Sequence, residues 1–213
     1  MHIPDGIVPL PVVAAGYVLS GGLAWYSIRR IRQSGNHADG VARAALLTAA
    51  FFTLSAVHLP LPPTSVHLVL NGLMGILLGW YAFPAILVGL FFQAVLFGHG
   101  GITTLGINGV IVGMPALVSY GLFHVGAGRS RAGYGQGTIF GFLAGAVAPV
   151  LSVLLFVAIV LGTLPAELSR ATEIRAVTIL AAAYVPLVLF EGVLAALVVA
   201  FISRIRPTML RGV

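Results

Sequence analysis

Apolar stretches of about 20 residues recur along the whole chain, and they constrain its fold more than any other feature. Only 8% of the residues are charged and 59% are hydrophobic, whereas a soluble domain carries about 25% charged residues. A helix of about 20 apolar residues is long enough to cross the hydrocarbon core of a bilayer. We therefore expect an all-α integral membrane protein in which residues 1–213 form a single membrane domain.

Polar and proline-rich breaks divide the apolar sequence into seven expected transmembrane helices. These spans cover about residues 10–28, 44–58, 65–80, 83–97, 107–125, 138–161 and 177–202. The second, third and fourth spans are shorter than the ~20 residues of a full crossing. The pattern leaves open whether these three cross the membrane completely.

The positions of the arginines orient the expected helices. With seven spans, nine of the eleven basic residues fall on one side, namely Arg29, Arg30, Arg32, Arg43, Arg129, Arg131, Arg204, Arg206 and Arg211. The other side has Arg170 and Arg175, which Glu167 and Glu173 balance. Because positive residues favour the cytoplasmic side, we expect the N-terminus outside and the C-terminus in the cytoplasm of a bacterial cell, with the chain in its cytoplasmic membrane.

Composition also excludes several functional classes. The chain has no cysteine, which excludes disulfides, thiolate catalysis and thiolate-bound zinc or iron–sulfur centres. Its net charge is +6, but the arginines form no basic stripe with interleaved aromatic residues, so nucleic acid is not an expected partner. No G-x-x-x-x-G-K-[ST] loop occurs either, so this chain is not expected to hydrolyse ATP.

A histidine stands at the second position, although chain ends are usually disordered. We expect this end to be retained, because it differs from a signal peptide. The segment before the first apolar run contains no basic residue and does contain an acidic one, Asp5. The α-amine of Met1 and the backbone nitrogen and Nδ1 of His2 can then close two fused chelate rings. Three nitrogens in one plane leave a fourth corner open, an arrangement that suits Ni(II) or Cu(II), and imidazole sites also take Co(II).

The expected topology brings further polar residues to the outer side, where a solute would arrive. His67 is our candidate for the fourth corner, and His58 is held in reserve. If residues 65–80 are helical, Asn71 lies one turn from His67 on the same face. The candidates for contacts around the metal or for the lining of its cavity are Asp5, His58, Asn71, Gln93 and His99. For His58 and His99, an ordinary interfacial role is favoured, and a further alternative for His99, in its glycine-rich connection, is to shape a re-entrant loop.

Three motifs resemble the CbiM/NikM family of substrate-binding membrane subunits in energy-coupling-factor importers for cobalt and nickel. They are "MHIPDG" at the start, "PTSVHLVLNGLMGILLGW" around the third span and "FGHGGITTLGIN" after the fourth. The resemblance implies a seven-helix fold with the N-terminal segment, residues 1–9, tucked into the bundle from outside. It also implies that Met1, His2 and His67 bind the transported metal, with no other cofactor. The choice between Ni²⁺ and Co²⁺ stays open.

The resemblance further implies partners that use ATP. The family works with two cytoplasmic ATP-binding subunits, a transmembrane coupling subunit and often a small additional membrane subunit. Small-residue faces dock the coupling subunit in such importers, and the spacing of Ala45 and Ala49 provides a candidate face.

Two other functional classes remain as alternatives. An intramembrane metallohydrolase would need a metal-activated water and a general base, but the sequence has no H-E-x-x-H motif. A passive metal-ion channel would conduct ions without an ATPase. Glu191 lies deep in the last span, where a carboxylate is a functional candidate by default, and we considered that it contacts a partner helix or pairs with His124.

Overall fold

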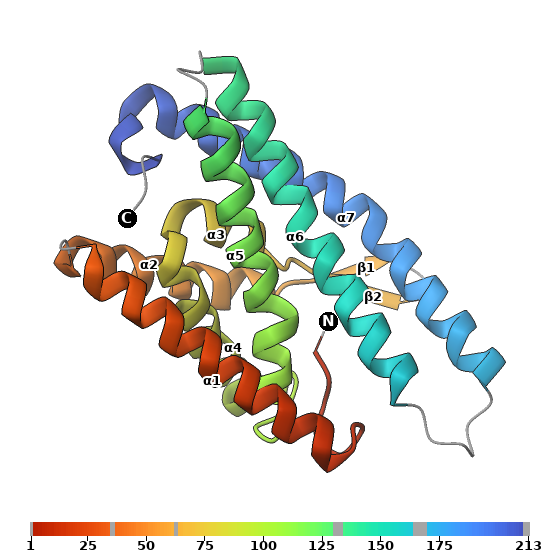
Figure 1. The fold of residues 1–213 in the computed structure, drawn as a ribbon. Coiled ribbons are helices and arrows are strands. Elements are labelled where there is room, and N and C mark those ends of the chain that lie inside the picture. Colours follow the sequence, from red (N-terminus) through yellow and green to blue (C-terminus); the bar gives the residue numbers. More distant parts are fainter. Residues whose placement is uncertain (1, 35–36, 62–63, 130–133, 164–169, 211–213) are drawn as a thin grey trace.

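The computed structural model describes residues 2–34, 37–61, 64–129, 134–163 and 170–210. The chain is mostly helical in this part (Figure 1). The helices are α1 (Leu10–Gln33), α2 (His37–Ser55), α3 (Asn71–Leu78), α4 (Ala82–Phe97), α5 (Leu105–Arg129), α6 (Tyr134–Gly162) and α7 (Arg170–Ile205). Two strands, β1 (His58–Leu61) and β2 (Thr64–His67), and two 3-10 turns, η1 (Gly79–Tyr81) and η2 (Pro207–Leu210), complete the described elements.

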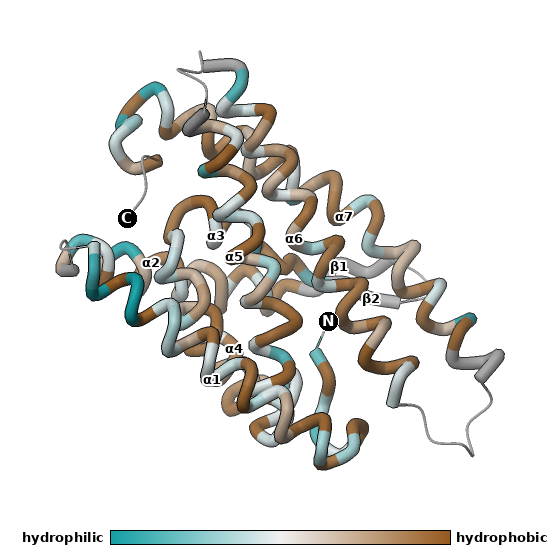
Figure 2. Tube along the Cα trace, in the orientation of Figure 1, coloured by the Kyte–Doolittle hydropathy of each residue, from teal (hydrophilic) through white to brown (hydrophobic). Residues whose placement is uncertain are grey.

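Five helical segments of the described chain are long and apolar enough to cross a membrane. They are Leu10–Gln33, Asn71–Phe97, Leu105–Ala127, Gln136–Gly162 and Ile174–Ile205, with mean hydropathies from 1.2 to 2.7. Figure 2 shows hydrophobic residues along most of the length of these helices, with hydrophilic residues near the end of α1 and the start of α2. The expectation of a multi-pass helical membrane protein is therefore confirmed.

The third expected span differs from the structure. We predicted a helix over about 65–80, but residues 64–67 form strand β2, and the helix α3 begins only at Asn71. Strands β1 and β2 form an antiparallel hairpin in which His58 is the partner of His67 and Leu61 that of Thr64. The sequence "LPLPPT" explains this, because proline lacks an N–H and favours extended backbone in the preceding residue. The prediction that Asn71 lies one helical turn from His67 is consequently wrong.

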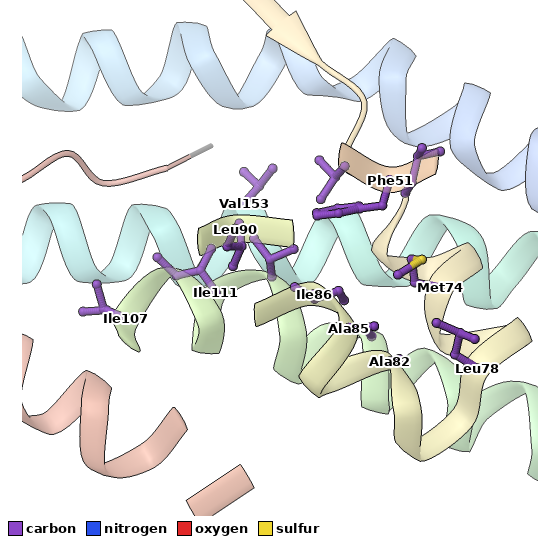
Figure 3. Close-up of a cluster of buried hydrophobic side chains, with 14 of the residues drawn as sticks. Phe51, Met74, Leu78, Ala82, Ala85, Ile86, Leu90, Ile107, Ile111 and Val153 are labelled. Atoms are coloured by element: carbon purple, nitrogen blue, oxygen red, sulfur yellow. The ribbon is translucent and has the colours of Figure 1, made fainter. Parts of the chain in front are cut away.

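Helix α5 lies at the centre of the bundle and packs against α1, α3, α4 and α6. Helices α6 and α7 run side by side as a long antiparallel pair, and the hairpin lies next to α7 (Figure 1). A cluster of buried side chains joins these layers, including Phe51, Met74, Ile86, Ile111 and Val153 (Figure 3). The N-terminal segment 2–9 lies beside this core and contributes the buried side chains of Ile3 and Val8.

Glycines allow the short helix α3 to approach its neighbours at backbone distance. A Cβ at Gly75 would overlap the carbonyl group of Ala116 in α5, and a Cβ at Gly72 would press on the backbone of Gly145 in α6. Small residues permit such close helix packing in membranes, where tight van der Waals contact replaces the hydrophobic driving force. The position of α3, and of the segment that precedes it, depends on these glycines.

We expect Gly75→Ala to lower the thermal unfolding temperature of the protein in detergent. The added methyl group meets backbone atoms that cannot rotate away, and overpacking of this kind costs about 1–3 kcal/mol. Gly121→Ala in α5 is the matched control, because a Cβ there meets no atom within 4 Å. Equal unfolding temperatures for the two variants would show that α3 and α5 are not in backbone contact.

Candidate metal site

The structure brings together two histidines that are 65 positions apart in the sequence. His2 comes from the N-terminal segment and His67 from the end of β2, and their ring centroids lie 5.0 Å apart with an interplanar angle of 15°. His67 is buried, at 9% exposure, and His2 is half-buried. Each imidazole therefore belongs to a non-helical segment that lies within the helical bundle.

A hydrogen bond indicates which nitrogen of His67 carries the proton. The Nδ1 atom lies 3.1 Å from the carbonyl oxygen of Leu68. A carbonyl oxygen only accepts, so a neutral His67 donates its proton from Nδ1 and keeps its lone pair on Nε2. Donation of the second ring nitrogen to a carbonyl is the usual way in which a protein orients a metal-binding imidazole.

The surroundings of the two rings are mostly apolar. A small cavity beside them is lined by Phe51, Ser55, Leu68, Val69 and Val112. The Nδ1 atom of His2 is shielded from solvent. Among the described residues, no group of three or more His, Asp or Glu side chains is placed to hold a metal ion. A metal at this position would need donors besides these side chains, and Met1, the source of a free amine in our prediction, lies outside the described residues.

The backbone of Ile3 fixes the N-terminal segment against α5. The Asn108 side chain accepts a hydrogen bond from the Ile3 N–H at 2.8 Å and donates one to the Ile3 carbonyl oxygen at 3.0 Å. The Thr104 hydroxyl donates to the same carbonyl at 2.6 Å. The Ile3 side chain is 1% exposed. These bonds supply the partners that extended backbone needs when it lies inside a helical bundle.

Asp5 ties the same segment to the loop before α5. Its carboxylate accepts hydrogen bonds from the Thr103 hydroxyl at 2.6 Å and the Thr104 N–H at 3.2 Å. The bond from Thr103, with the help of backbone N–H donors, lowers the pKa of Asp5 below its ordinary value of 3.8. The carboxylate bonds are thus fully present at neutral pH and are lost only in acid, as the pH falls through this lowered pKa. A Cβ at Gly101 would overlap the carboxylate, so the close approach requires glycine there.

The other predicted lining residues are placed as follows. Asn71 is fully buried and donates to the Val112 carbonyl and to the Ser152 hydroxyl, rather than facing the histidines through a shared helix. Gln93 is buried and donates to the hydroxyl of Ser55, a residue that lines the cavity.

The remaining predicted lining residues are two histidines, His99 and His58. His99 is half-buried, with its ring 6.0 Å from that of Phe97. The backbone of His58 pairs with that of His67 in the hairpin, while the His58 side chain lies outside the described part of the structure.

The carboxylate of Glu191 is bound by backbone groups and not by His124. It accepts hydrogen bonds from the N–H groups of Val69 and Leu70, within this chain. His124, the partner that we considered, is exposed and its ring lies near that of Tyr120. The pairing with His124 is therefore wrong.

Ala45 and Ala49 lie on an exposed face of α2. Together with Val88 and Phe92 of α4, they line an apolar groove of about 540 Å³ between the two helices.

Sequence reasoning missed the residues that hold the two histidine-bearing segments in place. It did not include Asn108, Thr103 or Thr104 among the candidate site residues. The signal was present in "GGITTLGIN", where three hydrogen-bonding side chains stand at the entry to an apolar helix. Their partners lie about 100 residues away, in the N-terminal segment.

The sequence matches the family described as cobalt uptake substrate-specific transmembrane region, CbiM, over residues 2–209. A solved structure titled "Crystal Structure of an Truncated Transition metal Transporter" has the same fold, with a TM-score of 0.74 at 23% identity. The match covers 96% of this chain and 99% of that one.

Relatives over nearly the whole chain include a putative cobalt transport protein CbiM of Methanococcus voltae, which is 31% identical over 98% of this chain and 94% of that protein. A putative metal transport protein of Haemophilus influenzae is 37% identical over 58% of this chain, a match that spans 57% of its own length. A fused nickel transport protein NikMN of Rhodobacter capsulatus is 41% identical over 60% of this chain and 38% of its own length. The chain thus spans little more than half, or less, of these last two proteins.

We expect Asn108→Leu to loosen the N-terminal segment, because the backbone of Ile3 loses two hydrogen bonds. At about 1 kcal/mol for each bond, amide hydrogen exchange of residues 3–8 should accelerate on the order of tenfold or more. Mass spectrometry of the N-terminal peptide measures this rate. Gln33→Leu, at the exposed end of α1, is the matched control and should leave it unchanged. Equal rates in both variants would exclude the role of Asn108.

Proposed function

The chain belongs to the CbiM family of cobalt uptake transmembrane proteins, and we propose that it is the subunit that captures Ni²⁺ or Co²⁺ from the outside of the cell. The family assignment makes it a multi-pass membrane component of cobalt and nickel transport. The observation that carries the more specific proposal is the apposition of the His2 and His67 rings.

In the proposed site, four nitrogens surround the metal in a plane. They are the α-amine of Met1, the backbone nitrogen and Nδ1 of His2, and Nε2 of His67. With metal–nitrogen bonds of about 2 Å, two imidazoles on adjacent corners of a square have centres roughly 4–5 Å apart, against roughly 6 Å on opposite corners. In the proposed chelate His67 lies on the corner adjacent to the His2 ring, and the observed separation of 5.0 Å supports this arrangement.

The donor set favours a borderline transition metal over a hard cation. Nitrogen ligands in a plane suit Ni(II), and imidazoles also suit Co(II), whereas Mg²⁺ and Ca²⁺ prefer oxygen ligands. The relatives are named for nickel as well as for cobalt transport. Binding requires a deprotonated amine and neutral imidazoles, so affinity should fall as the pH is lowered.

We place seven crossings in the membrane, with the N-terminus outside and the C-terminus in the cytoplasm. The contacts of Arg30 and Tyr120 with Trp80 put the arginine-rich end of α1 and the late part of α5 at one level of the bundle. Asp5 and Thr103 mark the opposite end, beside the histidines. The positive-inside rule then leaves the histidine site at the outer side. Arg131 and Arg211 lie outside the described residues.

Energy would come from partner subunits. The 213-residue sequence contains no phosphate-binding loop of the P-loop type, so two ATP-binding subunits and a transmembrane coupling subunit are the proposed partners, with a small additional membrane subunit in some assemblies. The groove beside Ala45 and Ala49 is our proposed docking face for the coupling subunit. Small residues there allow a partner helix to approach closely.

Hydrolysis at the metal is the less favoured function. A metallohydrolase needs a general base beside the metal. Glu191, the carboxylate that lies within a span, has both oxygens engaged by backbone N–H groups. The transport role needs no such base.

Adding one alanine before Met1 should change Ni²⁺ binding at this site so that it no longer depends on His67. The extension moves the amine away and shifts the histidine to position 3, where the chelate takes a second backbone nitrogen and no longer needs His67. One alanine added after Val213 is the matched control and should leave binding unchanged. Isothermal titration with Ni²⁺ measures both, and His67→Ala should weaken binding in the unextended protein.

If the N-terminally extended protein binds and transports Ni²⁺ as the original does, the proposed site is wrong. Loss of binding in the C-terminally extended control would instead indicate a general effect on folding.

Ala49→Phe should prevent assembly with the proposed coupling subunit while Ni²⁺ binding stays intact. The phenyl ring fills the groove between α2 and α4, whereas Ala50→Phe, at an exposed position that does not line the groove, serves as the control. Co-purification of the partner subunits with each variant measures assembly. Equal recovery with both variants would move the docking face elsewhere.

A further inference from the structure

Glu191 connects α7 to the segment that follows His67. Its side chain is 3% exposed, and its two oxygens accept hydrogen bonds from the N–H of Val69 at 2.5 Å and the N–H of Leu70 at 2.9 Å. Both bonds join residues more than 120 positions apart in the sequence. A buried carboxylate with both oxygens used in this way is committed to the backbone it binds.

The segment 68–70 needs these bonds because it is irregular backbone among transmembrane helices. It links the end of β2 to the start of α3, and Leu70 has a positive φ of 53°, the only non-glycine residue of the described chain that does. No side chain of the segment itself caps α3 at Leu70. Unsatisfied N–H groups at membrane depth cost several kcal/mol each, and a carboxylate at a helix N-terminus also complements the helix dipole.

A second side chain of α7 contacts the same segment. Tyr184 lies seven residues before Glu191, which is about two helical turns, so both side chains are on one face of α7. Tyr184 forms a hydrogen bond with the backbone of His67. One face of α7 therefore holds the backbone at His67 and again at Val69 and Leu70, on both sides of the carbonyl of Leu68 that orients the His67 ring.

We infer that Glu191 is a positioning residue of the metal site, which fixes the backbone after His67 and thereby directs the lone pair of Nε2 toward His2. This inference rests on the proposed function, since it assumes that His67 binds the metal. It follows that the position of α7 and the geometry at the metal are linked. A shift of α7 along α6 would move the carbonyl of Leu68 and turn the His67 ring away from His2.

Substitutions at Glu191 separate this role from a general effect on the fold. Glu191→Met keeps the length of the side chain but accepts no hydrogen bond, whereas Glu191→Gln keeps one acceptor oxygen. Thr178→Val is the matched control on α7, because the exposed Thr178 hydroxyl bonds its own helix, at Ile174. Each purified variant is titrated with Ni²⁺ against a competing chelator, its d–d absorption is recorded, and its thermal unfolding is followed without metal.

We expect Glu191→Met to weaken Ni²⁺ binding by about 10–100-fold, the usual loss when a group that orients a metal ligand is removed. The d–d band should shift because His67 no longer completes the plane. The Ni²⁺ affinity of Glu191→Gln should fall between that of Glu191→Met and that of the original protein. Thr178→Val should have the affinity and the d–d band of the original. Glu191→Gln keeps the inference testable even if the Met variant does not fold.

Two results would overturn the inference. One is a folded Glu191→Gln or Glu191→Met protein with the affinity and d–d band of the original, provided that His67→Ala weakens binding. The other is a loss of affinity with an unshifted band and a lowered unfolding temperature, which would reduce Glu191 to a structural residue. If the original protein itself does not bind Ni²⁺ through His67, the proposed function fails instead.

Discussion

The two hydrogen bonds between the Asn108 side chain and the backbone of Ile3 are the contacts on which the candidate site depends. They allow an extended chain end to lie inside a helical bundle, where its N–H and C=O groups would otherwise be without partners at membrane depth. The buried Ile3 side chain adds an apolar anchor. With residue 3 fixed, His2 lies next to His67. The chain end becomes a fixed part of the site because the Asn108 side chain, from α5, bonds the backbone N–H and C=O of Ile3. In a sheet, a neighbouring strand would supply these bonds.

The same solution recurs on the other side of the site. His67 also lies at the edge of irregular backbone. There the carboxylate of Glu191, from α7, accepts hydrogen bonds from the N–H groups of Val69 and Leu70, which lie between the hairpin and α3. Each histidine is thus carried by a non-helical segment, and each segment is held by a polar residue from a long helix. Buried polar groups are costly in an apolar environment unless their partners are complete. Here they fix the two imidazoles while the helices provide the apolar surroundings.

Hydropathy predicted much of the helical framework, because a membrane permits few alternatives to the helix. The expected spans over 107–125 and 138–161 lie inside α5 and α6. The hairpin at 58–67 was not predicted, since a window of hydrophobic residues reads the same for a buried strand and a helix. The prolines of "LPLPPT" were the better signal. The pairing of Glu191 with residues 69 and 70 could not be read from the sequence, because it joins distant segments through backbone atoms.

In the proposed site, a transported dication is bound in a plane by four nitrogens, three of them from the chain end. The most direct test is the electronic state of the Ni²⁺ complex of the purified protein at neutral pH. Four nitrogens in a plane predict one Ni²⁺ per chain in a yellow, diamagnetic complex. A paramagnetic, six-coordinate Ni²⁺ with bound water would contradict the planar site, even if His2 and His67 were both ligands.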